Sequence, residues 1–256
     1  MASSYILSKK VNHGEYACIY QLELHPNYLA KVQFVKRNSA TKKEAEIHSE
    51  LLHPNIIRVI DAFHSDTLIR LTPSYQPGET SLYQILILEK HGVELDKKNN
   101  YTIEKLKLYA FQITEGLVYL KQKNIIHRDI KPPNLLLQDG TVKICDFGLA
   151  CFGPTYKSPP RESTGTPLYM PLTSFKGFYD FSTDVFAFGV TLYELYTKEM
   201  PFPASNLRGL IDLVNFGCVM FPDGYEEYDL HDLIVKMLRN QGRIGIEEVK
   251  EHGFFK

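Results

Sequence analysis

The stretch from His127 to Gly148 constrains this chain more than any other part of the sequence. It opens with H-R-D-I-K-P-P-N and closes with D-F-G, and two short aliphatic runs separated by Asp139-Gly140 lie between these motifs. An Asp-Gly pair flanked by such runs predicts a tight β-hairpin. A hairpin brings the residues before its first strand close to those after its second, so we expect polar residues of both motifs to share one cavity.

Those polar residues have the composition that phosphoryl transfer requires. Asp129, Asn134 and Asp146 would supply one carboxylate to orient an attacking hydroxyl group and further oxygen ligands for magnesium ions, which neutralise charge on phosphates. Each residue alone would fit an ordinary loop or turn, but the order of both motifs together is too specific for that interpretation.

With these motifs the chain resembles the eukaryotic-type protein kinases, and the resemblance covers essentially its whole length. It implies Asp129 as the catalytic base, Asn134 and Asp146 as magnesium ligands, and Lys131 as a catalytic contact to the transferred phosphate. A lysine two residues after the catalytic aspartate is the serine/threonine pattern. The resemblance therefore implies a serine/threonine kinase that transfers the γ-phosphate of Mg-ATP to hydroxyl groups of protein substrates.

The hydrophobic pattern changes character near Glu89. Before it, β-branched and aromatic clusters at 17–22, 28–35 and 82–88 predict strands of a small antiparallel sheet. Residues 40–52 contain no glycine or proline and predict one helix, which we expect to end at His53-Pro54-Asn55 because proline disfavours helical geometry in the preceding residue.

After Glu89 the pattern is mainly helical. Apolar residues recur at helical spacing over about 103–122, and we expect further helices over 183–196, 205–216, 230–239 and 246–252. The predicted buried stripe of the first helix consists of Leu106, Ala110, Ile113, Leu117 and Leu120. The resemblance implies an α+β, bilobal kinase fold, with 1–256 as a single domain, a small lobe at 1–89 and a large lobe at 90–256.

The N-terminal part resembles the glycine-rich loop and the strand that follows it. In V-N-H-G-E-Y-A-C-I-Y, Gly14 is kept while Asn12 and Ala17 replace the first and third glycines of the family. Glycine there allows a tight turn and close approach to phosphate. The resemblance implies nucleotide contacts from Val11, Gly14 and Ile19.

Lys31 lies in the next predicted strand, and Glu44 lies nine residues before the H-P-N turn. The resemblance implies an ion pair between them that aims Lys31 at the α- and β-phosphates, with Glu46 as the alternative partner.

Around the adenine, the resemblance implies Leu88 as the gatekeeper and backbone hydrogen bonds from Glu89 and His91. Glu94 is placed to reach the ribose, although a solvated carboxylate is an equally good interpretation. Leu136 and Cys145 would line the nucleotide pocket, and Cys145 also fits a small buried apolar residue.

Several positions depart from the family pattern. Met170-Pro171-Leu172 replaces Ala-Pro-Glu, so Arg243 loses the glutamate partner that the resemblance implies, and we expect its surroundings to be rearranged or hydrated. Leu29 falls where the family has alanine against adenine, so either it crowds the nucleotide or a β-bulge shifts the register. His48 occupies an apolar position, where a neutral, hydrogen-bonded core histidine is favoured over a pH switch.

The segment that follows D-F-G carries the remaining implications of the resemblance. Arg128 would belong to a basic pocket for phosphate on this segment. Glu162 is a candidate to replace that phosphate, although a solvated glutamate fits equally well, and phosphorylation of Ser163 or Thr164 is the rival hypothesis. Gly165-Thr166-Pro167 resembles the loop that holds the substrate, and Asp184 would support the catalytic loop.

Composition narrows the range of partners, metal sites and cellular locations that we expect for this chain. With 29 basic and 30 acidic residues among 256, the net charge of -1 gives no argument for nucleic acid or a membrane as partner. The four cysteines form no Cys-x-x-Cys pair, which favours a reducing compartment over a zinc site or disulfide framework. Without a signal peptide or spanning segment, we expect a cytoplasmic or nuclear location.

Two alternatives stay open. A nucleotide-binding pseudokinase scaffold would explain the eroded glycine loop, Leu29, His48 and the missing glutamate. A small-molecule phosphotransferase of kinase-like fold shares H-x-D-x-x-x-x-N, but Lys131-Pro132 and the Gly165-Thr166-Pro167 loop favour a peptide acceptor.

Overall fold

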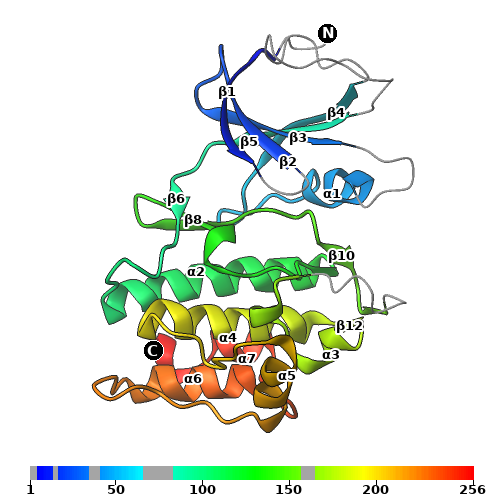
Figure 1. The fold of residues 1–256 in the computed structure, drawn as a ribbon. Coiled ribbons are helices and arrows are strands. Elements are labelled where there is room, and N and C mark those ends of the chain that lie inside the picture. Colours follow the sequence, from blue (N-terminus) through cyan, green and yellow to red (C-terminus); the bar gives the residue numbers. More distant parts are fainter. Residues whose placement is uncertain (1–4, 14–16, 35–40, 66–82, 157–164) are drawn as a thin grey trace. The chain divides into compact units, whose positions relative to one another are not determined.

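The computed structural model describes residues 5–13, 17–34, 41–65, 83–156 and 165–256. It divides into two compact units, Met1–His91 and Gly92–Lys256 (Figure 1). The predicted boundary between lobes, after residue 89, lies two residues before this division. Among the described residues, a small sheet with one helix in the first unit and mainly helices in the second confirm the predicted α+β class.

The small unit contains one five-stranded antiparallel sheet in the order β1-β2-β3-β5-β4. Its strands are β1 (Leu7–His13), β2 (Ala17–Leu22), β3 (Tyr28–Phe34), β4 (Val59–Ser65) and β5 (Tyr83–Glu89). The pairing of β3 with β2 and with β5 shows no register shift. Ala30 and Val32 face a hydrophobic core that they share with Leu22 and Ile87, so the residues that alternate with them lie on the other face.

Helix α1 (Thr41–His48) of the small unit ends earlier than the predicted 40–52 helix. The Ser49 N–H still donates to the Ala45 carbonyl at 3.0 Å, and the Leu51 N–H then donates to the carbonyl of His48, three residues back, at 3.2 Å. This turn leaves Leu51 buried. The helix therefore stops before Pro54, because burial of Leu51 fixes the turn earlier than the proline requires.

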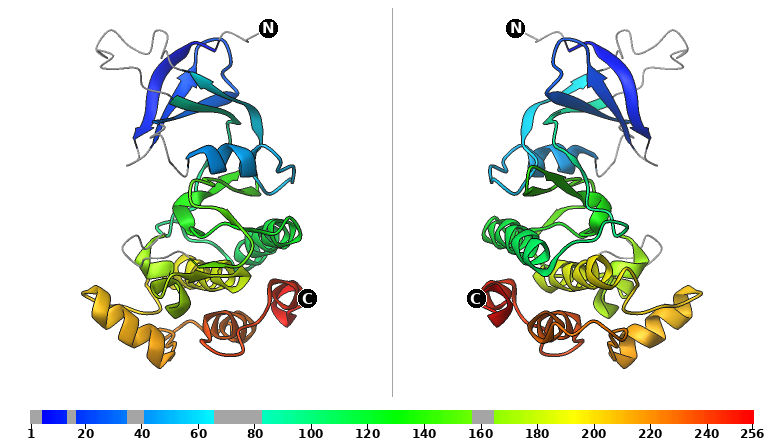
Figure 2. Two further views of the ribbon diagram at one scale, coloured as in Figure 1. Left: turned by 90° about the vertical axis from the view of Figure 1, so that its right-hand side faces the viewer. Right: turned by 90° about the vertical axis from the view of Figure 1, so that its left-hand side faces the viewer.

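Helices of the large unit pack in a stack in which α4 lies between α2 and α6 (Figures 1 and 2). The long helices are α2 (Ile103–Gln122), α4 (Phe181–Thr197), α5 (Leu207–Phe216) and α6 (Tyr228–Leu238), and the short ones are α3 (Leu172–Phe175) and α7 (Ile246–Lys250). All five residues of the predicted stripe on α2 are buried. The four predicted helices after α2 are also confirmed, with ends that differ by a few residues.

Helix α4 forms the centre of this stack because nearly all of its residues are buried. Asp180 caps its N-terminus by accepting the Ser182 N–H at 2.9 Å, and the Asp180 N–H donates to the Thr183 hydroxyl. Such reciprocal capping satisfies N–H groups that have no partner inside the helix. Asp184 follows directly, on the first turn of a helix with a well-defined start.

The strands of the large unit are short. They are β6 (Val93–Glu94), β7 (Ile125–Ile126), β8 (Leu135–Gln138), β9 (Thr141–Ile144), β10 (Cys151–Phe152), β11 (Thr155–Tyr156) and β12 (Phe178–Tyr179). β8 and β9 form the predicted hairpin, and its turn residues Asp139 and Gly140 have φ angles of 50° and 78°. Left-handed conformations at both positions are those of the two-residue hairpin turn that Asp-Gly favours.

The described part of the large unit also contains three one-turn 3₁₀ helices. They are η1 (Pro132–Asn134), η2 (Pro167–Tyr169) and η3 (Gly253–Phe255). None of the helices among the described residues is both long and apolar enough to cross a membrane.

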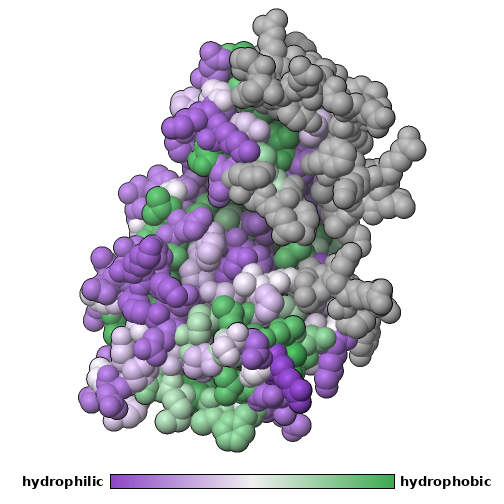
Figure 3. All heavy atoms as spheres, viewed as in Figure 1, coloured by the Kyte–Doolittle hydropathy of each residue, from purple (hydrophilic) through white to green (hydrophobic). Residues whose placement is uncertain are grey.

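Helix α5 contributes only Leu210 and Val214 to the core. Leu207, Leu213 and Phe216 remain exposed, with 79% of the Phe216 surface accessible. Apolar side chains accordingly appear on the surface of the large unit in the space-filling view (Figure 3).

Two helical glycines, one packed against α6 and one in open surroundings, predict substitution effects of opposite sign. A Cβ at Gly189 of α4 would lie 2.9 Å from Met237 Cβ, whereas a Cβ at Gly209 of α5 would make ordinary contacts, with Asn206 Oδ1 at 3.5 Å and Ala204 Cβ at 3.8 Å. We expect Gly189→Ala to lower the free energy of unfolding by about 1–2 kcal/mol, because overpacking exceeds the gain in helix propensity. Gly209→Ala should raise it by about 0.5 kcal/mol. Urea unfolding measures both, and a stabilised Gly189→Ala would contradict the packing.

Candidate active site

In the small unit, Lys31 and Glu44 form a buried ion pair. Lys31 on β3 places its Nζ 2.7 Å from Glu44 Oε1, and the side chains are 8% and 1% exposed. Gln33 lies on the same face of β3 and donates from Nε2 to Glu44 Oε2 at 2.6 Å. Both carboxylate oxygens thus have donors, as a buried charge requires. The predicted Lys31–Glu44 pair is confirmed, while the alternative partner Glu46 is exposed.

The sequence interpretation missed Gln33. Its position two residues after Lys31 in a strand was a usable signal, because alternation puts both side chains on one face. The same alternation puts Leu29 on the face of Lys31. Since β3 pairs without a register shift, the β-bulge offered as an explanation for Leu29 is wrong.

His48 is buried at the end of α1. Its Nε2 lies 2.7 Å from the Ile57 carbonyl oxygen, and only 1% of its surface is exposed. A carbonyl oxygen can only accept, so Nε2 carries a proton and donates. His48 is therefore a hydrogen-bonded core histidine, as predicted.

The other predicted nucleotide contacts of the small unit lie on its strands. Val11 on β1 is exposed, and Ile19 on β2 is half-buried opposite Asn12. At the end of β5, the Glu89 N–H donates to the Arg58 carbonyl at 3.0 Å, and Glu89 Oε1 accepts the Arg58 N–H at 2.8 Å. Leu88 and His91 are half-buried, and Gly14 lies outside the described residues.

In the large unit, three side chains contact Asp129, the catalytic aspartate that the motif predicts. Asn134 Nδ2 donates to Asp129 Oδ2 at 2.9 Å, and Lys131 Nζ forms an ion pair with the same oxygen at 2.8 Å. The hydroxyl of Thr166 donates to Asp129 Oδ1 at 2.9 Å and accepts from Lys131 Nζ at 2.7 Å. These donors fix the carboxylate plane and leave Asp129 able to accept a further proton.

Thr166 was predicted only as part of the substrate loop, and its contact with Asp129 was missed. Gly165 explains how the loop comes so close. Its φ of 123° lies in the left-handed half of conformational space, and a Cβ there would lie 3.0 Å from the Arg128 carbonyl oxygen. Only glycine fits such an approach without strain.

The backbone of the catalytic loop is held by Asp184 of α4. Asp184 Oδ2 accepts the His127 N–H at 2.7 Å, and Oδ1 accepts the Arg128 N–H at 2.8 Å. Burial raises the pKa of the Asp184 carboxyl group, while His127 and Arg128 act to lower it. Because both oxygens accept N–H groups, the geometry favours the carboxylate form.

The ring of His127 has a defined tautomer. Nε2 lies 3.0 Å from the Cys145 carbonyl oxygen, so it donates, and Nδ1 accepts the Asp129 N–H at 3.3 Å. The ring also contacts Phe147 edge-on with centroids 4.8 Å apart. His127 therefore links the H-R-D and D-F-G motifs through a neutral imidazole.

Asn134 and Asp146 provide oxygen atoms of the kind that magnesium prefers. The Asn134 amide uses Nδ2 for Asp129, which leaves Oδ1 as an acceptor. The Asn134 carbonyl accepts the Cys145 N–H at 2.9 Å, which brings Asn134 beside the residue that precedes Asp146. Asp146 is exposed and has a φ of 63°, a left-handed conformation uncommon outside glycine. Amide and carboxylate oxygens so arranged fit a magnesium ion.

Three predicted nucleotide contacts lie on or beside the β6-β8-β9 sheet. Glu94 is exposed and pairs with Leu136, which is half-buried. Cys145 is half-buried, so the interpretation of this residue as a small buried apolar residue does not fit the structure.

Arg243, which lacks the glutamate partner of the family, contacts Ser182 and Phe186 instead. Its Nη1 donates to the Ser182 hydroxyl at 3.0 Å and to the Ser182 carbonyl at 3.2 Å, and the guanidinium lies 4.9 Å from the centre of the Phe186 ring. Burial lowers the pKa of Arg243 to about 10, so the group remains charged at neutral pH. The expected rearrangement around Arg243 is confirmed in this form.

A second ionisable cluster lies on the substrate-loop side. Tyr169 donates its hydroxyl to Glu194, and Lys97 Nζ lies 3.2 Å from the other oxygen of that carboxylate. Burial, followed by the Glu194 contact, raises the pKa of Tyr169. The tyrosine is therefore a hydrogen-bond donor at neutral pH. Glu162 lies outside the described residues, so its predicted role stays a prediction.

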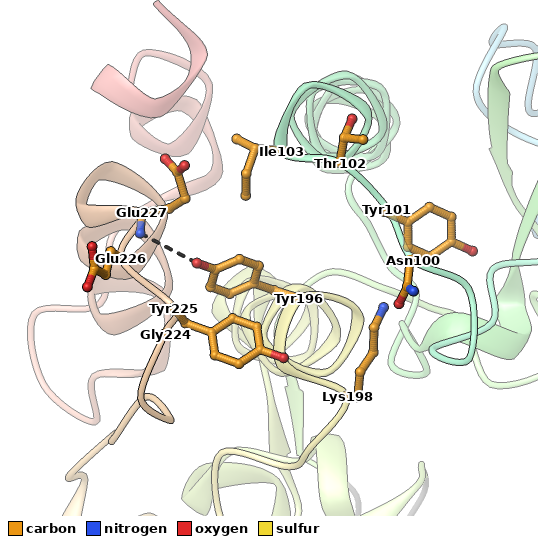
Figure 4. A pocket seen from close by; sticks show the side chains of 10 residues that line it. All are labelled: Asn100, Tyr101, Thr102, Ile103, Tyr196, Lys198, Gly224, Tyr225, Glu226 and Glu227. Atoms are coloured by element: carbon orange, nitrogen blue, oxygen red, sulfur yellow. Dashed lines mark hydrogen bonds between the residues drawn. The ribbon is translucent and has the colours of Figure 1, made fainter.

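A cavity of about 480 Å³ in the large unit is separate from these residues. It lies between the start of α2, the end of α4 and the segment before α6, where Tyr196 accepts the Glu227 N–H (Figure 4). No predicted site residue lines it.

Comparison with known proteins agrees with this geometry. The protein kinase domain family matches residues 5–255. Aurora kinase B of Danio rerio is 33% identical over 89% of this chain and 69% of its own length. Serine/threonine-protein kinase TIO of Arabidopsis thaliana is 31% identical over 98% of this chain, and serine/threonine-protein kinase 36 of Mus musculus is 33% identical over 71% of it.

This chain belongs to the protein kinase domain family. It spans 19% of the length of the Arabidopsis protein and 13% of that of the mouse protein. Kinases of this family generally use ATP and Mg²⁺. The relatives support the prediction of a serine/threonine protein kinase, and nothing in them favours the pseudokinase alternative.

The buried ion pair of the small unit generates a prediction with a matched control. Glu44→Gln removes the charge that balances Lys31, and an unpaired buried ammonium group should lower the free energy of unfolding by about 3 kcal/mol. Glu46→Gln, on the exposed side of the same helix, should change it by less than about 0.5 kcal/mol. Urea unfolding measures the stability of both variants. Equal losses of stability would mean that the Lys31 charge is not balanced by Glu44.

Proposed function

We propose that this chain is a serine/threonine protein kinase that transfers the γ-phosphate of ATP to a hydroxyl group of a protein. The observation that carries the proposal is the Asp129 carboxylate, which is held by Asn134, Lys131 and Thr166. A base of this kind must keep one orientation while it accepts the proton of the attacking hydroxyl.

In the proposed reaction the substrate hydroxyl oxygen forms a bond to the γ-phosphorus as the bond to the bridging oxygen of ADP breaks. Asp129 takes the hydroxyl proton. The Nζ of Lys131, which lies 2.8 Å from Asp129 Oδ2, places a positive charge next to the phosphoryl group that is transferred. Asn134 and Asp146 would hold magnesium, which would balance the charge of the phosphates.

The nucleotide-binding set follows the family pattern. Lys31, paired with Glu44, contacts the phosphates, and Asp146 would supply a carboxylate oxygen for magnesium. The remaining proposed contacts are Val11, Gly14, Ile19, Leu88, Glu89, His91, Glu94, Leu136 and Cys145.

The acceptor is proposed to be serine or threonine in a protein. Lys131 contacts Thr166 in the loop that the resemblance assigns to the substrate, at 2.7 Å. This contact joins the phosphate-binding lysine to the peptide-binding loop, and it favours a protein acceptor over a small molecule.

Transfer assays with Asp129→Asn test the proposal. The protein is incubated with Mg²⁺, γ-labelled ATP and generic protein acceptors, and labelled residues are identified. Because the amide cannot accept the proton, we expect the rate of serine and threonine labelling to fall by a factor of roughly 10²–10⁴. Asp139→Asn, in the exposed hairpin turn where asparagine tolerates the left-handed conformation, should retain the wild-type rate.

The other outcomes distinguish the alternatives. Nucleotide-induced thermal stabilisation of the wild type without any transfer would identify a pseudokinase. Label on small molecules alone would identify a small-molecule phosphotransferase.

A further inference from the structure

Arg128 is held in an unusual way next to the catalytic aspartate. Its φ of 68° lies in the left-handed region, and 6% of its surface is exposed. A non-glycine residue persists in this region only when its surroundings hold it there. Arg128 must therefore be well anchored, because a change in its backbone conformation would move the next residue, Asp129.

Three groups anchor Arg128. Its N–H donates to Asp184 at 2.8 Å, its Nε donates to the Leu149 carbonyl at 2.5 Å, and its guanidinium carbon lies 5.0 Å from the centre of the Tyr179 ring. The first two anchor the backbone and one edge of the guanidinium. The aromatic ring covers the guanidinium itself.

Tyr179 is rigidly placed for this contact. It is 1% exposed, and it pairs with Thr155 where β12 meets β11. The next residue, Asp180, is the N-cap of α4, the helix that also carries Asp184. Two residues at or just before the start of α4 therefore hold Arg128. The Asp184 carboxylate accepts the backbone N–H of Arg128, and the Tyr179 ring contacts its guanidinium group.

The charge of Arg128 has no carboxylate or phosphate in ion-pair contact within the described ranges, and its buried Nη1 has no hydrogen-bond partner there. Asp184 is the charged neighbour that interacts with it electrostatically. A cation on an aromatic face gains most when water is excluded. The buried Tyr179 ring supplies such a face to Arg128.

We propose that Tyr179 is a positioning residue whose ring, in place of an anion, holds Arg128 and through it the catalytic loop. Its effect on transfer rests on the proposed function. Its effect on the loop does not, because the contacts exist in the protein without substrate. The catalytic loop is then ordered in protein that carries no phosphate.

The test compares Tyr179→Leu, Tyr179→Phe and Phe254→Leu in protein whose intact mass shows no phosphate. Phe254 is also a buried aromatic residue of the large unit, at 4% exposed, and its recorded ring contact is with Phe255. Hydrogen exchange of peptides that cover residues 125–131 reports the catalytic loop. Transfer assays give kcat and the KM for ATP separately.

Tyr179→Leu should raise exchange of the loop and lower kcat roughly tenfold or more, with little change in KM, whereas Tyr179→Phe keeps the ring and should restore both. Phe254→Leu should lower thermal stability alone. If Tyr179→Leu does not fold, Arg128→Lys, which loses the planar stack, must show the same faster exchange in the loop.

Two results would overturn the proposal. Equal loop exchange in Tyr179→Leu and Phe254→Leu would make the ring merely structural. A loop that becomes protected only after phosphate incorporation would make an anion the true partner of Arg128. Absence of transfer in the wild type with a protected loop would instead refute the proposed function and leave the positioning role intact.

Discussion

Asp184 accepting two consecutive backbone N–H groups is the interaction on which the rest of the site depends. The carboxylate stands on the first turn of a buried, capped helix, and it binds His127 and Arg128 at 2.7 and 2.8 Å. Two adjacent donors need two acceptor oxygens, which a carboxylate provides and an amide does not. Arg128 has a left-handed backbone conformation, so the anchor that holds it there also fixes the direction of the chain at Asp129.

The small unit solves a related problem of buried charge. Lys31 and Glu44 would each be costly alone, but both oxygens of Glu44 have donors, one from Lys31 and one from Gln33. One departure from the family pattern is compensated locally. Ser182 and the Phe186 ring take the place of the absent glutamate at Arg243.

The motifs predicted that Asp129 and Asn134 lie together, because the order of these residues along the chain is itself the constraint. Asp139-Gly140 predicts the hairpin turn through local conformational preference, and the apolar stripe of α2 predicts a helix because its period matches one buried face. The end of α1 was not predictable, since it depends on burial of Leu51 rather than on the nearby proline. Contacts between segments far apart in sequence, such as Thr166 with Asp129 and Tyr179 with Arg128, have no local signature.

The most direct test of this account is amide exchange in Asp184→Asn, followed by NMR at His127 and Arg128. Asparagine has the same shape but one acceptor oxygen, so at least one of the two amides should lose protection by tenfold or more while α4 remains folded, and transfer should fall by a factor of roughly 10². Asp180→Asn at the N-cap, where asparagine caps as well as aspartate, should leave both amides protected. Full protection of both amides in Asp184→Asn would contradict the claim that this carboxylate holds the catalytic loop.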